Sequence, residues 1–376
     1  MMEGGMPRTR FSMISKAGLI AIGAWFATIS GVVLGACGRE APVVIGFAAS
    51  LSGKDYLLGV EGRNAAELFV KEANARGGVG GRLLRLDIRD LASDDANAAP
   101  VTAALVESGV SVIVGYFTSS SAVAALAAPG LGGAALVSPS ATADSLDGKA
   151  DALYRTIMSS RLDSLFLAAH MRARGLRRVL FMATEGNRPY AETYAVPLAR
   201  EAEVVADIRF GAISDIDYGA IASLRYDAVL IVASPLDTGT VAQELSIRGL
   251  SAPLYISGWA GNDSLIAHGG KAVDGAVFVH QTDTDQAGVA AVSSRYRAVY
   301  GESPGFAAIQ AWDAMLLVEA AIEASGQGGV AAAIRGTRSF EGLSGTIEID
   351  EFGDATRTVY YKKVDGDRIV VVGKAE

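Results

Sequence analysis

Apolar residues recur at extended and helical spacing along nearly the whole chain after residue 43. In the first part, short apolar runs predict buried strands at 44–49, 83–88, 110–114 and 134–137. Between the first two runs, Ala65, Leu68, Phe69 and Ala73 share one face of a predicted helix at 59–76. Another helix precedes residue 108. It is expected to begin near Asn97, because Pro100 fits only in a first turn.

The same alternation resumes after residue 158. Further strands are predicted at 178–182, 204–210, 228–232, 254–257 and 277–280. Helices are predicted at 160–174, 190–201, 238–248, 287–300 and 306–324. The tail instead shows alternating segments at 345–349, 356–363 and 368–372. Asp365-Gly366 separates the last two, which predicts a hairpin.

This order of elements predicts an α/β protein. Strands that alternate with helices over about 300 residues form parallel sheets covered by helices. One sheet of that many strands would be unusually wide, so two doubly wound parallel-sheet lobes are expected. Sites in such folds lie at the carboxyl ends of the strands, and a ligand is therefore expected in the cleft between the lobes.

The first 37 residues have the pattern of an export signal. Arg8, Arg10 and Lys16 precede an uncharged apolar stretch at 17–36. The ending Leu34-Gly35-Ala36-Cys37 resembles a bacterial lipobox, in which the cysteine becomes the first residue and carries lipid. We therefore expect a signal peptide at 1–36 and a protein lipid-anchored through Cys37 on the outer side of the cytoplasmic membrane. The alternative is a membrane-spanning anchor, since the stretch has the length to cross a bilayer.

Composition excludes several classes of function. The 376 residues carry a net charge of −8 without a basic run, which is unfavourable for nucleic-acid binding. A single cysteine and three distant histidines provide no metal-ligand spacing, so neither a metal nor a cofactor is predicted. No paired nucleophile and base appears, which argues against an enzyme.

Two hydroxyl-rich loops follow the third and fourth predicted strands. The first, 115–121, contains Ser119, and the second, 138–144, contains Ser140 and Thr142. A helix start offers free N–H groups, so the first loop is suited to a carboxylate. The simpler interpretations are a serine that caps a helix, and a turn followed by a cap. The loops end consecutive strands, so they are expected to converge.

Several segments in a fixed order resemble the type I periplasmic binding proteins of the branched-chain amino acid branch. The matching stretches lie at 45–53, 62–86, 112–121, 137–146, 154–156 and 311–317. The resemblance implies two lobes, joined by three crossovers, that close on a ligand and present it to the permease of an ABC importer. It places the lobes at 41–158 plus 282–342 and at 159–281 plus 343–376.

The resemblance also assigns candidate ligand-binding residues. It implies that Ser119, Ser140, Ala141 and Thr142 hold the charged groups of an amino acid or related carboxylate. It further implies an aromatic contact from Tyr190 in the second lobe, for which a half-buried aromatic at a helix start is the alternative. In the first lobe the aromatic position falls at Tyr56 or at Leu58, which aligns just before Gly59. Where such proteins place an acid near the ligand ammonium, this chain has Trp259, with Asp263 nearby. Trp259 could stack on an aromatic or cationic ligand or pack in the core, and Asp263 could be a displaced acid or a helix cap.

These observations favour a lipid-anchored receptor for a small carboxylated solute that serves an ABC importer. An extracytoplasmic sensor with the same fold, which passes lobe closure to a signalling partner, is the alternative.

Overall fold

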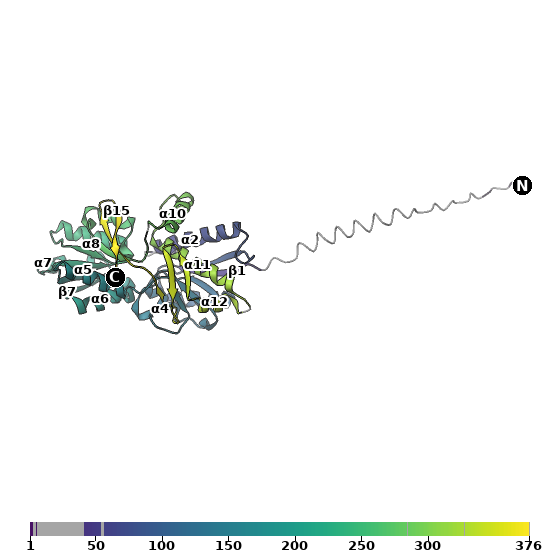
Figure 1. Ribbon diagram of the computed structural model, residues 1–376, viewed down its shortest axis with the longest axis horizontal. Coiled ribbons are helices and arrows are strands. Elements are labelled where there is room, and N and C mark those ends of the chain that lie inside the picture. The colour runs from purple at the N-terminus through teal and green to yellow at the C-terminus, as the bar shows by residue number, and fades with distance from the viewer. Residues whose placement is uncertain (3–4, 6–40, 54–55, 284, 327, 376) are drawn as a thin grey trace. The chain divides into compact units, whose positions relative to one another are not determined.

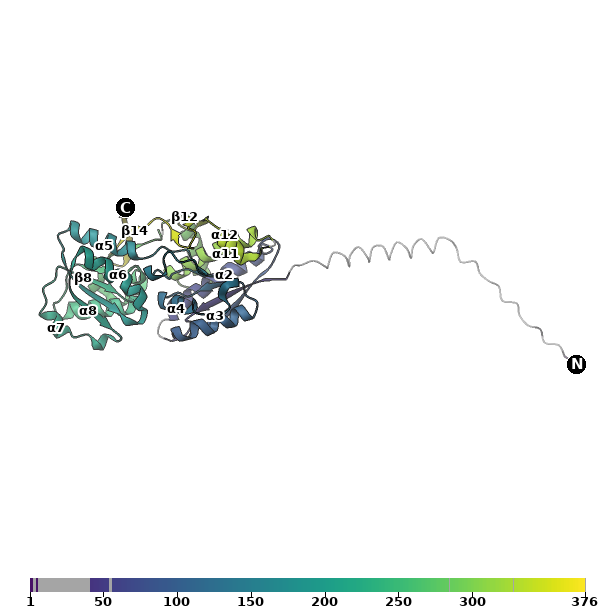
Figure 2. The ribbon, with the colours of Figure 1, turned by 90° about the horizontal axis from the view of Figure 1, so that it is seen from below.

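The computed structural model describes residues 1–2, 5, 41–53, 56–283, 285–326 and 328–375. The expected export signal and Cys37 lie outside these residues, apart from the first few positions. Val43–Glu376 form one compact unit, to which the following description applies. Within it, the elements gather into two lobes, with α2, α4, α11 and α12 in one and α5 to α8 in the other (Figure 1). The same grouping is visible from below (Figure 2).

The first lobe is built on a parallel sheet in the order β2-β1-β3-β4-β5. Its strands are β1 (Val43–Ala49), β2 (Leu84–Asp90), β3 (Val112–Gly115), β4 (Ala135–Ser138) and β5 (Leu153–Arg155). Successive side chains enter opposite cores, as the pleat of a strand requires. Ile45 and Phe47 face one core, whereas Val44 and Ala48 face the other.

Helices cover both faces of this sheet, which is why its strands are apolar throughout. On the Ile45 side lie α2 (Tyr56–Ala75), α10 (Ala287–Tyr300), α11 (Phe306–Ala324) and α12 (Gly329–Gly336). On the other side lie α3 (Ala98–Glu107) and α4 (Ser119–Ala125). The prediction for Pro100 is confirmed, because α3 begins at Ala98 and places the proline in its first turn.

The second lobe has a sheet in the order β15-β14-β10-β9-β8-β6-β7. Its parallel strands are β6 (Arg178–Thr184), β7 (Glu203–Phe210), β8 (Ala228–Val232), β9 (Leu254–Ile256) and β10 (Val277–His280). The antiparallel β14 (Tyr360–Asp365) and β15 (Arg368–Lys374) extend it, and the pairing of Asp365 with Arg368 confirms the predicted hairpin.

Helices also cover both faces of the second sheet. One face packs against α5 (Arg161–Ala173) and α6 (Arg188–Glu201). The other packs against α7 (Tyr218–Ala222), α8 (Pro235–Ile247) and α9 (Asp263–Gly269). The fold class expected from the sequence, two lobes with mainly parallel doubly wound sheets, is confirmed. Among the described residues, no helix has both the length and the apolar character needed to cross a membrane.

The tail differs from the prediction in one respect. The expected strand at 356–363 is two strands, β13 (Ala355–Thr356) and β14, which belong to different sheets. With β11 (Ser339–Gly342) and β12 (Gly345–Ile349), β13 forms a small sheet whose side chains enter the first lobe's core. The second lobe therefore resumes after β13 and not at 343. The alternation of apolar and polar residues continues where the chain leaves one sheet and enters the other, so it does not reveal this change of sheet. Arg357, which is buried at this point, does not mark it in the sequence either.

Three segments carry the chain between the lobes within the described residues, near 156–160, 281–283 and 357–359. The first two are tied together by one side chain. The Gln281 Oε1 atom accepts a hydrogen bond from the Met158 backbone N–H at 2.6 Å, and its Nε2 donates to the Met158 carbonyl at 3.1 Å. In the third segment, Arg357 Nη1 donates to the buried Asp313 carboxylate at 2.9 Å.

Candidate ligand-binding site

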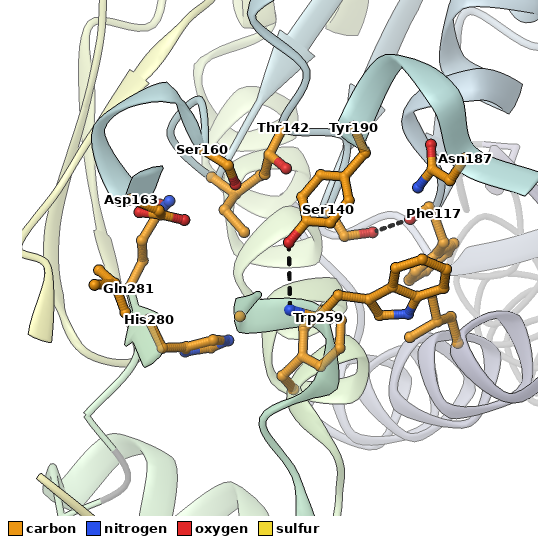
Figure 3. Close-up of a pocket in the computed structure, with 15 residues that line it drawn as sticks. Phe117, Ser140, Thr142, Ser160, Asp163, Asn187, Tyr190, Trp259, His280 and Gln281 are labelled. Carbon is orange, nitrogen blue, oxygen red and sulfur yellow. Dashed lines mark hydrogen bonds between the residues drawn. The ribbon is translucent and has the colours of Figure 1, made fainter. Parts of the chain in front are cut away.

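A pocket lies between the two lobes, and its atom-free space of about 460 Å³ includes open solvent at its mouth. It opens at the carboxyl ends of strands from both sheets, where the doubly wound topology predicts it. Most of the side chains that form it are shown in Figure 3. The first lobe contributes Leu58, Phe117, Ser140, Thr142 and Phe306. The second lobe and the crossovers contribute Ile157, Ser160, Asp163, Asn187, Tyr190, Gly258, Trp259, Val279, His280 and Gln281.

The two hydroxyl-rich loops converge, as predicted from their place after consecutive strands. The Ser119 Oγ atom accepts hydrogen bonds from the backbone N–H groups of Thr142 and Ala143, each at 3.1 Å. Ser119 is 1% exposed and does not line the pocket. In this structure it holds the second loop in place, and Thr118 caps α4 by accepting from the Ser121 N–H.

The second loop, 138–144, brings to the pocket one hydroxyl that is hydrogen-bonded within the protein and one that is not. Ser140 lines the pocket and donates its hydroxyl hydrogen bond to the Phe117 carbonyl at 2.8 Å. Thr142 also lines the pocket, but its buried Oγ1 atom has no hydrogen-bond partner. Ala141 is buried behind the loop, where its N–H donates to Ser138 Oγ at 3.1 Å. Thr142 is therefore the loop side chain with hydrogen-bonding capacity left for a ligand.

On the opposite side, a chain of long hydrogen bonds links the aromatic residues to one carboxylate. The Trp259 N–H donates to the Tyr190 hydroxyl at 3.4 Å, and Tyr190 donates to Tyr194 at 3.2 Å. Tyr194 in turn donates to Asp163 Oδ2 at 3.4 Å. The rings of Tyr190 and Trp259 meet edge to face, with centroids 5.9 Å apart. Both predicted second-lobe aromatics, Tyr190 and Trp259, thus line the pocket.

Asp163 is a pocket residue that the sequence analysis did not identify. It lies in the first turn of α5, is 4% exposed, and has a buried Oδ1 atom without a partner. Burial raises the pKa of this carboxyl to about 7, although the nearby hydroxyl groups of Ser160 and Tyr194 act in the opposite direction. The sequence gives little sign of this role, because an acid in the first turn of a helix is ordinary.

Other candidates from the sequence lie away from the pocket lining. Tyr56 is 50% exposed at the start of α2, and Leu58 from the same turn lines the pocket in its place. Asp263 is exposed at the start of α9, next to the N-cap Asn262, and does not line the pocket. Asp163 is instead the carboxylate that the second lobe brings to the pocket. Cys37 lies outside the described residues.

Direct hydrogen bonds join the lobes beside the pocket. The Ser120 N–H donates to Asn187 Oδ1 at 3.3 Å. The Asp144 N–H donates to Thr193 Oγ1 at 3.0 Å, and the Thr193 hydroxyl lies 3.2 Å from Asp144 Oδ1. These contacts hold α6 against the loops that follow β3 and β4. Among the described residues, no cluster of three or more potential metal ligands occurs.

Comparisons with known proteins agree with this geometry. The family model described as "Periplasmic binding protein" matches residues 42–368. A Leu/Ile/Val-binding protein homolog 1 from Brucella abortus is 28% identical over 139 residues, which is 36% of this chain and 33% of that protein. The aligned part of the chain therefore spans about a third of the length of this curated relative.

Solved structures match over a larger part of the chain. A branched-chain amino acid transporter substrate-binding protein from Streptococcus pneumoniae, in complex with isoleucine, has a TM-score of 0.80 and 25% identity. The match covers 88% of this chain and 99% of that one. An ABC transporter solute-binding protein from R. palustris, in complex with benzoate, has a TM-score of 0.77 and 24% identity. That match covers 89% of this chain and 96% of that one, and at this identity it bears on the fold alone.

Proposed function

The chain belongs to the periplasmic binding protein family, and from this premise we propose that it captures an amino acid or a similar small carboxylated solute between its lobes and delivers it to an ABC importer. The solved structures that match this chain include a transporter substrate-binding protein and a leucine-binding protein, which are solute-binding proteins and not enzymes. The observation that carries the proposal is a pair of buried polar atoms without partners, Thr142 Oγ1 and Asp163 Oδ1, on residues that line one pocket from opposite lobes.

The two atoms have complementary chemistry. A threonine hydroxyl can donate a hydrogen bond to a carboxylate, and an ionised aspartate can accept from an ammonium group. A buried polar atom without a partner costs free energy, which a ligand with matching groups would remove. The zwitterionic head of an amino acid carries both groups, so Thr142 and Asp163 together favour this class of solute.

The rest of the pocket suits an apolar or aromatic side chain. The rings of Phe117, Tyr190, Trp259 and Phe306 line it, and no lysine or arginine is among the lining residues. Trp259 also packs against the main cores of both lobes, so it serves as a packing residue and as a pocket wall. This arrangement can bury the hydrocarbon part of a solute while the polar groups fix its head.

Closure of the lobes would complete the site. A ligand that contacts Thr142 on one lobe and Asp163 on the other stabilises the closed state, because only that state makes both contacts. The hydrogen bonds of Asn187 with Ser120 and of Thr193 with Asp144, which join the lobes in this structure, would add to the stability of the closed state. Anchorage through lipid on Cys37 would keep the protein near its importer at the outer face of the membrane.

A thermal-shift screen of the twenty amino acids and small aromatic acids tests the proposed ligand class. A solute that binds only the folded state raises the free energy of unfolding by about 2.7 kcal/mol at one hundred times its Kd. Failure of every compound to raise Tm would contradict the amino-acid assignment. Uptake of a stabilising solute by cells with and without this gene would then separate transport from sensing, since a sensor changes signalling and leaves uptake unaffected.

A further inference from the structure

His280 is a pocket residue to which neither the fold nor the proposed function gives a role. It is the last residue of β10, is 7% exposed, and lines the pocket. Figure 3 shows its ring reaching from the strand toward the middle of the pocket, on the opposite side from Thr142 in this view. The hydrogen-bonding state of its two ring nitrogens determines which groups of a bound solute this ring can contact.

The ring nitrogen Nδ1 is already engaged. The Thr282 backbone N–H lies 3.1 Å from it, and a backbone amide can only donate. Nδ1 is therefore the acceptor, and in a neutral imidazole the hydrogen must reside on Nε2. No described residue accepts a hydrogen bond from Nε2.

The orientation of the ring is fixed by its neighbours. On one side it meets the Phe306 ring edge to face, with centroids 5.7 Å apart. Its Cδ2 edge lies against Gly258, where a Cβ atom would come within 3.4 Å of Cδ2. Since Nδ1 and Cδ2 contact the protein and the ring also meets Phe306, the Nε2–H group is the polar part of the ring left for the pocket.

The surroundings also keep the ring uncharged. Burial lowers the pKa of His280 well below its ordinary value, and the nearby cationic groups of Lys362 and Arg357 lower it further. Lys362 itself is 4% exposed, on the strand that pairs with β10. A neutral N–H donor in front of buried cations favours an electron-rich oxygen as its partner.

We propose that His280 is a specificity residue that donates its Nε2–H to an oxygen on the part of the ligand remote from the head group held by Thr142. This inference rests on the proposed function, because it requires a solute in this pocket. It narrows the solute class to molecules that carry such an oxygen, such as a hydroxylated aromatic amino acid or a hydroxy acid. A site built to bond a ligand hydroxyl rejects the analogue that lacks it, because its own polar group then loses its partner.

Binding measurements with matched pairs of solutes test the inference. The pairs are tyrosine and phenylalanine, 4-hydroxybenzoate and benzoate, and threonine and valine. The full chain without its first 36 residues is titrated with each solute by calorimetry. We expect the oxygen-bearing member of at least one pair to bind about tenfold more tightly or better, as a gained hydrogen bond in a buried site implies.

Three variants make the assignment specific. His280→Leu should abolish the preference within the pair. His280→Gln, whose amide nitrogen can approximate Nε2, should keep part of it. His268→Leu, which makes the same change at an exposed position of α9, should keep all of it. A preference that survives His280→Leu, or equal affinity within every pair that binds, would overturn the inference and leave the proposed function intact. Absence of binding by all six solutes would overturn the inference, while the proposed function would be contradicted only if the wider screen of amino acids and aromatic acids also failed.

The tautomer of His280 can also be measured in the wild-type protein without ligand, so this test does not depend on whether a variant folds. Two-bond ¹H–¹⁵N correlation spectra of the wild-type protein distinguish the two neutral tautomers from imidazolium. The expected result at pH 7 is a neutral His280 with its proton on Nε2. A proton on Nδ1, or a charged ring, would also overturn the proposal.

Discussion

Ser119 and Thr142 are joined by a hydrogen bond of 3.1 Å from the Thr142 backbone N–H to the Ser119 hydroxyl oxygen, although 23 residues separate them in the chain. The same oxygen accepts from Ala143. One buried hydroxyl thus fixes the loop that carries the unpartnered Thr142 side chain into the pocket. This bond holds the segments that follow β3 and β4 next to each other.

Ser119→Ala should weaken both the fold and ligand binding. It leaves two buried N–H groups without an acceptor, which costs about 1–3 kcal/mol of unfolding free energy. Affinity should fall as well, because Thr142 loses its support. Urea unfolding and calorimetric titration measure the two effects. Ser120→Ala is the matched control, since it keeps the backbone N–H bond to Asn187 and loses only a 3.3 Å hydroxyl contact with Thr118. Equal behaviour of the two variants would contradict the role of Ser119.

Thr142→Val should separate affinity from stability. Valine has nearly the shape of threonine and removes a buried hydroxyl that has no partner in the protein. The free energy of unfolding should therefore stay the same or rise, while ligand affinity falls by about 1–3 kcal/mol for a lost bond to a charged group. Denaturant unfolding and titration of the same samples provide the comparison. Unchanged affinity would remove Thr142 from the site.

Asp163→Asn should change how stability depends on pH. Burial raises the pKa of Asp163 from 3.8 to about 7. Between about pH 4 and pH 7 the folded protein therefore holds a proton that the unfolded chain has lost. The free energy of unfolding falls as pH rises through this range, and the full cost of about 4 kcal/mol is present above it. Asparagine carries no such charge, so the variant should lose this part of the pH dependence.

Urea unfolding of both proteins from pH 4 to pH 8 measures this difference. Glu61, whose pKa burial raises to about 8, contributes in the same direction to both proteins, so the difference between the two curves isolates Asp163. Parallel curves would show that Asp163 ionises without a cost in the folded state.

Arg357→Leu should destabilise the fold strongly. Arg357 and Asp313 are 2% and 0% exposed, so loss of the guanidinium leaves a buried carboxylate without a counter-charge. The expected cost is about 3–5 kcal/mol. The double variant with Asp313→Asn should recover part of it, because the charge is then gone. Arg172→Leu, which breaks the exposed pair with Glu201, should change stability by about 0.5 kcal/mol or less. Similar losses in both single variants would contradict the argument from burial.

Cys37→Ser should release the protein from the membrane. The lipobox-like sequence predicts lipid on the Cys37 sulfur, and serine lacks the thiol that carries it. Membrane fractionation with metabolic lipid labelling measures the change, with wild type as the reference. Retention of the unlabelled variant in the membrane fraction would favour the alternative of a spanning anchor.

The sequence predicted the fold well where periodicity carries the information. Apolar runs such as 277–280 and the helix at 306–324 were predicted with the bounds that the structure has, because burial alone determines their pattern. The passage from β13 to β14 was not predicted, because alternation continues across it while the chain changes sheets. Arg357, which lies at this passage, pairs with Asp313, and a local sequence pattern does not reveal a contact with so distant a residue.

The site could be predicted only as far as the loops that follow strands. The hydroxyl clusters around Ser119 and Thr142 are visible in sequence because they end consecutive strands. Asp163 and His280 are not, since an acid in a helix's first turn and a histidine at a strand end are both common. Their place in the pocket follows from the meeting of two lobes, which brings together residues more than a hundred positions apart.

The clamp of Gln281 on both backbone groups of Met158 has a mechanical consequence. Two separate connectors could each twist about their own axis and allow the halves of the molecule to swing in many directions. Because they are hydrogen-bonded to each other, the two connectors should bend together as one hinge and should resist sliding past each other. We therefore expect the lobes to open and close along one main direction, set by these joined connectors.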